Sequence, residues 1–140
     1  MTTDQAGLVA LLDELLEAER AGARVTLESA RAATDAPTAA LLMAIHRDEA
    51  RWCAMLLRHI KAAGRAPSTK VGAFYGKAMA IDDLGERIVF LNRGQGWVVR
   101  KLRDMLARVG DDSLRADLAE MLRSHEDNIA LANKVVGQGA

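Results

Sequence analysis

A polar residue interrupts the apolar seam of each of four segments with helical periodicity. These residues are Glu19, Glu49, Asn92 and His125. A buried carboxylate, amide or imidazole costs free energy unless it finds a partner, so four of them at one depth predict a shared polar layer. Such a layer is either a metal site or a hydrogen-bonded network, and both require the four segments to surround one core.

Composition favours a single all-helical domain. The 140 residues are 50% hydrophobic, which suffices for one core and not for two, so we expect one domain over residues 1–140. Aromatic residues make up 4% of the chain, and Pro37 and Pro67 are its two prolines. This composition is typical of an all-α protein and not of a sheet protein.

Charge and hydropathy argue against several classes of partner. Nineteen basic and nineteen acidic residues give a formal net charge of zero, which does not favour binding to nucleic acid or to an anionic membrane. The longest uncharged helical stretch, residues 36–45, is about half of a bilayer span, and the N-terminus lacks the features of a signal peptide. We therefore expect a soluble, cytoplasmic protein. Cys53 is the single cysteine, so we expect a small buried side chain and no disulfide framework.

The periodicity predicts four long helices and one long connection. The helices are expected over about 4–33, 37–63 and 81–108, and from 114 onward. Pro37 suits the first turn of the second helix, and Gly64 suits its end. Residues 65–80 read as a connection with some helical character and an anchor at Phe74 and Tyr75.

The depth of the polar residues predicts the topology. Glu49 lies about twelve residues into the second helix and Asn92 about eleven residues past Ile81, so the two are level if both helices start at the same end. Parallel helices need a long crossover, which residues 65–80 supply, whereas the short links demand antiparallel pairs. With those pairs, Glu19 and His125 also become level.

Two antiparallel helix pairs joined by a crossover, with a polar residue at the middle of each helix, resemble the ferritin-like superfamily of bacterioferritins and rubrerythrins. In that family a Glu from each of two helices and a Glu-x-x-His pair from each of the other two hold two metal ions. Glu19 and Glu49 match the ligands of the first two helices. The run from Leu91 to Trp97 is distinctive enough to mark an uncharacterised bacterial branch.

The sequence also departs from the family pattern. Trp52 stands where the first histidine belongs, and Asn92 replaces the carboxylate of the third helix. His125 and Asn128 occupy the positions of the last pair. With two carboxylates and both family histidines replaced, the resemblance does not imply a diiron oxidase or an iron store, and it leaves open whether the protein is an enzyme.

The surviving residues are compatible with three functions. The first is a site for one zinc, iron or manganese ion held by Glu19, Glu49 and His125, with His46 as a further donor. In that site the orienting amides would be Asn92, Gln95 and Asn128. The second is a structural or interaction module whose polar layer is a metal-free network, and the low net charge would allow such a module to form a homodimer. The third is a pocket for a small ligand around Trp52, Asn92 and Gln95.

Other polar residues of the third helix are expected at its surface. Its basic side chains are Arg87, Arg93, Arg100, Lys101 and Arg103, and we interpret them as a solvated face. Glu86 falls opposite the apolar seam and is expected in solvent. Gly94 and Gly96 flank Gln95 with a spacing that is found in glycine-rich nucleotide loops, but no predicted strand precedes them. We therefore expect close helix packing or a local bulge at these glycines.

Overall fold

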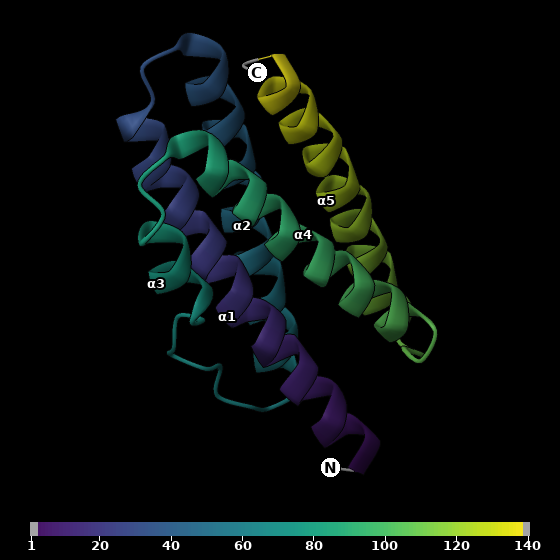
Figure 1. Ribbon diagram of the computed structural model, residues 1–140. Helices are drawn as coiled ribbons and strands as arrows, with labels where there is room; N and C mark the ends of the chain where they lie inside the picture. The colour runs from purple at the N-terminus through teal and green to yellow at the C-terminus, as the bar shows by residue number, and fades with distance from the viewer. Residues whose placement is uncertain (1–2, 139–140) are drawn as a thin grey trace.

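The computed structural model describes residues 3–138 and consists of helices, with no strand in that range. The helices are α1 (Thr3–Ala32), α2 (Ala36–Ala62), α3 (Phe74–Met79), α4 (Leu84–Leu106) and α5 (Asp112–Gln138). Figure 1 shows the four long helices side by side as a bundle, with α3 lying across α1 within the connection from α2 to α4. The prediction of an all-α bundle with four long helices is confirmed.

Local signals account for the helix ends. The side chain of Asp35 caps α2 by accepting a hydrogen bond from Thr38 N at 3.0 Å, with Pro37 in the first turn. Gly64 follows α2 with φ of 77°, a conformation that glycine adopts without strain. The helix α4 begins three residues later than Ile81, because Asp83 caps it by accepting from Glu86 N at 2.9 Å.

Contacts between α2 and α5 establish the topology. Asp48 contacts Asn128 at 3.1 Å, Trp52 contacts Ser124 at 3.2 Å, and Arg58 contacts Asp117 at 3.0 Å. Because the partners on α5 descend in number as those on α2 rise, the two helices are antiparallel. Since α1 and α2 form one hairpin and α4 and α5 another, α2 and α4 are parallel (Figure 1). The predicted crossover connection is therefore correct.

The crossover is fastened to α1. Ser68 N donates to Asp13 Oδ1 at 2.8 Å, and the Tyr75 hydroxyl donates to Glu28 at 2.9 Å. Arg20 donates to the Ser68 carbonyl, and Gly72 N donates to the Glu17 carbonyl at 3.2 Å. The helical part of the connection is α3, whose Phe74 ring stacks on Phe90 of α4 at 5.0 Å between centroids. The expected anchor at Phe74 and Tyr75 is thus present.

The core consists of two apolar clusters with polar residues between them. One cluster includes Leu12, Trp52, Leu102 and Leu118, and the other includes Val25, Ile45, Leu91 and Ala132. Along each long helix, buried polar residues lie between its contributions to the two clusters. They include Glu19, Glu49, Gln95 and His125, which we call the polar layer, and also Asn128 on α5.

Arg87 is a correction to the sequence analysis, which placed it on a solvated face. Its side chain is only 8% exposed. The guanidinium donates to Ser29 Oγ at 3.1 Å and, through Nε and Nη2, to the Ile81 carbonyl at 3.0 and 2.8 Å. Heptad position did not reveal this, because both acceptors come from segments outside α4. Glu86 is exposed, as expected.

Two further sequence interpretations concern Cys53 and membrane insertion. Cys53 is half-buried against the first core cluster and is not fully enclosed as expected. None of the helices within residues 3–138 has both the length and the apolar character needed to cross a membrane.

Candidate functional site

An ion pair between the first and last helices forms the centre of the polar layer. His125 Nε2 lies 2.7 Å from Glu19 Oε1, and both side chains are 2% exposed. On the other side of the ring, Nδ1 donates to the Met121 carbonyl at 2.9 Å, which fixes the ring orientation. The approach to Glu19 is short but lies outside hydrogen-bond geometry, so it is an ion pair without an aligned hydrogen bond.

The charge state of His125 follows from this pair. Burial opposes the positive charge on the ring, yet the negative charge of Glu19 and the bond to the Met121 carbonyl outweigh burial. As a result, the pKa of His125 is raised above its usual 6.5. The ring therefore holds its second proton more firmly than an exposed histidine does.

Glu49 is buried in the polar layer with an unsatisfied oxygen. Its side chain is 2% exposed, and Oε2 has no hydrogen-bond partner among the described residues. Burial raises the pKa of its carboxyl well above 4.5, and the negative charges of Glu19 and Asp48 raise it further. The carboxyl lies against bare backbone at Gly22, where an added Cβ would sit 1.7 Å from Oε2. Glycine at this position therefore makes room for Glu49.

Gln95, and not Asn92, completes the layer from α4. Gln95 is 3% exposed, and its Oε1 has no hydrogen-bond partner within residues 3–138. Asn92 points toward α5, where its amide donates to the Ile129 carbonyl at 3.2 Å and to Asn133 Oδ1 at 3.0 Å. It still contacts the layer at its edge, since its Oδ1 accepts from Gln95 Nε2 at 3.3 Å. The assignment of Asn92 to the layer itself was wrong.

The other predicted site residues lie around the layer without joining it. His46 Nδ1 donates to the Ala23 carbonyl at 2.7 Å, so its ring is directed at the α1 backbone. Trp52 is buried in the first core cluster and donates to Ser124. Asn128 donates to Asp48 and thereby helps to hold α5 against α2. None of the three lines the cavity described next.

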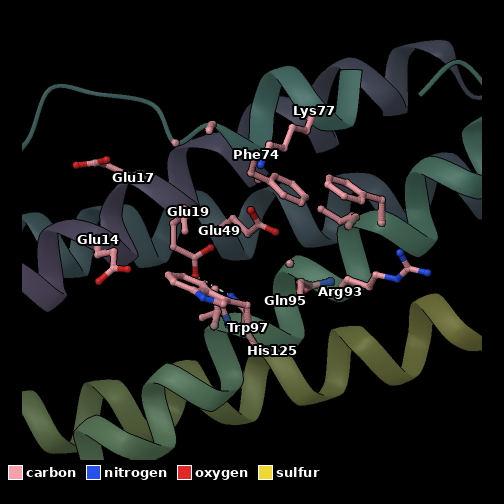
Figure 2. A pocket seen from close by; sticks show the side chains of 18 residues that line it. Glu14, Glu17, Glu19, Glu49, Phe74, Lys77, Arg93, Gln95, Trp97 and His125 are labelled. Carbon is pink, nitrogen blue, oxygen red and sulfur yellow. Dashed lines mark ion pairs between the residues drawn. The ribbon is translucent and has the colours of Figure 1, made fainter. Parts of the chain in front are cut away.

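A cavity of about 520 Å³ opens onto the polar layer between α1 and α4, beneath α3. We call it the α1–α4 cavity. Its floor consists of Glu19, Glu49, Gln95 and His125, and its walls include Phe74, Phe90, Leu91, Trp97 and Val98. Figure 2 shows the floor side chains at the centre, with Lys77 and Arg93 on one side of the opening and Glu14 and Glu17 on the other.

The donor set of this layer does not fit the dimetal site of the resembled family. Glu19 is engaged with His125, and the Glu49 carboxyl is directed at Gly22. Within the described part of the chain, no three His, Cys, Asp or Glu side chains are grouped so that they could hold a metal ion. His46, the proposed additional donor, is turned to α1. Metal ligation would thus require the floor side chains to rearrange.

Sequence reasoning missed the aromatic wall of the cavity and the role of Gly22, but it did anticipate close packing at Gly94. Gly94 allows close packing, as expected for this glycine pair, since a Cβ there would lie 2.8 Å from the Phe74 ring. Phe90 gave no signal, because an isolated aromatic residue on a helix is usually core. The contact between Gly22 and Glu49 joins two helices, so the sequence of one helix did not reveal it.

Comparisons with known proteins agree with this fold. A family model described as "Domain of unknown function (DUF6306)" matches residues 6–134. No curated protein sequence matches the chain significantly.

A similar solved structure is described as "Crystal structure of ferritin like, diiron-carboxylate proteins from Bacillus anthracis str. Ames". Its TM-score is 0.69 at 16% sequence identity, and the match covers 99% of this chain and 96% of that one. At this identity the likeness shows a ferritin-like fold. The diiron-carboxylate description applies to that protein.

Proposed function

The chain belongs to the DUF6306 family, and from its site we propose that it binds a small organic molecule in the α1–α4 cavity. The observation that carries this proposal is a 520 Å³ cavity lined by Glu49 and Gln95, two buried side chains that each have one oxygen, Oε2 and Oε1, without a hydrogen-bond partner among the described residues. Most buried polar groups in proteins have hydrogen-bond partners. Two buried oxygens without such partners, on side chains that line a cavity, therefore support a role in holding a ligand.

The chemistry of the walls supports the same proposal. Binding sites for small molecules are mostly apolar, with a few polar groups that fix orientation, and their volumes are of the order of 300–1,000 Å³. Here Phe74, Phe90 and Trp97 offer apolar surface, and the floor offers the polar groups. Such an arrangement suits a molecule with an apolar body and one polar end.

A ligand screen by thermal denaturation tests the proposal, because a ligand that binds only the folded state raises Tm. The matched variant is Ala18→Phe, which places a ring in the cavity from α1. Its control is Ala10→Phe, on the exposed face of the same helix. We expect hits that shift Tm in the wild type and in the control, and not in Ala18→Phe. Hits that shift all three proteins equally would refute binding in the cavity.

Tryptophan fluorescence supplies an independent readout. The chain has two tryptophans, Trp52 in the core and Trp97 in the cavity wall. In a Trp52→Phe variant, a molecule in the cavity should change the emission of Trp97 with the same Kd that calorimetry gives. An unchanged emission at saturation would contradict the proposed position.

Elemental analysis decides between this proposal and the metal site. We expect metal far below one ion per chain after incubation with iron, manganese or zinc and desalting, because the floor donors do not converge. Near-stoichiometric metal that disappears in Glu49→Ala would overturn the ligand proposal in favour of a metal site.

A further inference from the structure

The floor of the α1–α4 cavity is acidic. Glu19 and Glu49 both line it, and Asp48 contributes a further negative charge that acts on the layer. The positive group on the floor is the His125 ring, which Glu19 already pairs. Lys77 and Arg93 line the cavity too, but both side chains are exposed and belong to its opening. A positive charge placed at the bottom of the cavity would counteract the raised pKa of Glu49 and would pair with its carboxylate.

Apart from the Glu19–His125 ion pair, the buried floor atoms that lack a hydrogen-bond partner among the described residues are oxygens. Gln95 Oε1 only accepts, and Glu49 Oε2 accepts once the carboxyl is ionised. A protonated amine carries three N–H donors and no acceptor, so it complements this pair. A carboxylate or phosphate would instead bring acceptors against acceptors.

The walls suit a cation as well. Phe74, Phe90 and Trp97 are aromatic, and the faces of aromatic rings attract ammonium groups. The outer part of the wall already shows such a contact, since Lys101 Nζ lies 5.3 Å from the centre of the Trp97 ring. The aromatic surface also gives an apolar ligand body an extended area to pack against.

We infer that the α1–α4 cavity receives an organic ammonium ion, with its N–H groups on Glu49 and Gln95 and its apolar body along Phe74, Phe90 and Trp97. This inference rests on the proposed function and names the ligand class of the same site. The negative charge of ionised Glu49 is then balanced by the ligand, which removes the cost of burying that carboxylate alone. Glu19 remains with His125 and keeps the floor in place.

Three probes of one shape and different charge test the inference by isothermal titration calorimetry. They are phenethylamine, phenethyl alcohol and hydrocinnamate, which are cationic, neutral and anionic at neutral pH. We expect phenethylamine to bind about tenfold tighter than the alcohol, and hydrocinnamate to bind most weakly. Tighter binding of hydrocinnamate than of phenethylamine, or equal binding of all three, would overturn the ammonium assignment.

Variants locate the charge. Glu49→Gln keeps the size of the side chain and removes its charge, so it should weaken phenethylamine about tenfold and leave phenethyl alcohol within about twofold. The control is Glu126→Gln, an exposed glutamate of α5 that pairs with Arg103 away from the cavity, and it should change neither probe. An equal loss for amine and alcohol in Glu49→Gln would refute an ionic contact.

The outcomes separate the two proposals. One outcome is that the alcohol binds, that Ala18→Phe abolishes its binding, and that the amine binds no more tightly than the alcohol. The cavity is then a ligand site, but not one for ammonium ions. If none of the three probes binds and the wider screen also gives no hit that Ala18→Phe removes, both proposals fail. Circular dichroism of every variant ensures that lost binding is not lost folding.

Discussion

The contact between Gly22 and Glu49 predicts opposite effects of one substitution in two backgrounds. In Gly22→Ala the new Cβ would lie 1.7 Å from Glu49 Oε2 and 2.7 Å from Cδ, so the carboxyl has to move in a buried layer. Such overpacking costs about 1–3 kcal/mol. Alanine in a helix interior is more favourable than glycine by about 1 kcal/mol. We therefore expect Gly22→Ala to lower the free energy of unfolding by about 1 kcal/mol.

In a Glu49→Ala background the obstruction is absent, and the same Gly22→Ala change should raise the free energy of unfolding by about 1 kcal/mol. The coupling between the two positions, about 2 kcal/mol, is measured by a double-mutant cycle with urea denaturation. The control is Gly96→Ala in α4. The new Cβ there would lie 3.5 Å from the Arg100 side chain, which is an ordinary contact distance. If Gly22→Ala were equally stabilising in both backgrounds, the position assigned to Glu49 would be wrong.

Three further predictions concern protons, a buried cation and the thiol. Because the pKa values of Glu49 and His125 are both raised, the folded chain holds protons that the unfolded chain loses above pH 4.5 and pH 6.5, so the free energy of unfolding should fall as pH rises through these ranges. Glu49→Gln should flatten the lower part of this pH dependence in urea titrations, and an unchanged slope would contradict it. Arg87→Met should lower the free energy of unfolding by about 2–3 kcal/mol, because Ser29 Oγ and a carbonyl lose a charged donor; a loss below about 0.5 kcal/mol would indicate a solvated side chain. Burial raises the pKa of Cys53 to about 12, so iodoacetamide should label the folded protein far more slowly than the urea-unfolded chain, and equal rates would show an accessible thiolate.

The sequence predicted the bundle and its crossover because both depend on patterns within single helices. Heptad spacing located the long helices, and the matching depths of Glu49 and Asn92 in their helices predicted the helix directions. Helix starts were less accurate where a side-chain cap decided them, as at Asp83. These features follow from local chemistry, which a single sequence carries.

The site was predicted in part because its details depend on how helices are rotated against each other. Asn92 and Gln95 lie almost one turn apart on the same stripe, and only the packing of α4 against α5 directs Asn92 to Ile129 and Gln95 to the layer. His46 lies three residues before Glu49, and that offset turns it to the Ala23 carbonyl. Periodicity gives the face of a helix, but it does not give the rotation that separates neighbours on that face.

The distribution of polar contacts between the two hairpins has a mechanical consequence. Along α2 and α5, contacts recur from Asp48–Asn128 through Trp52–Ser124 to Arg58–Asp117, whereas the opposite seam between α1 and α4 contains the cavity. Near that opening, α1 and α4 are joined by the partly exposed Lys101–Glu14 pair. The α1–α4 seam is also joined on the other side of the cavity, by the buried Arg87–Ser29 hydrogen bond. A molecule bound in the cavity would contact both hairpins between these two links, and it would couple their positions at the level where the chain leaves a cavity.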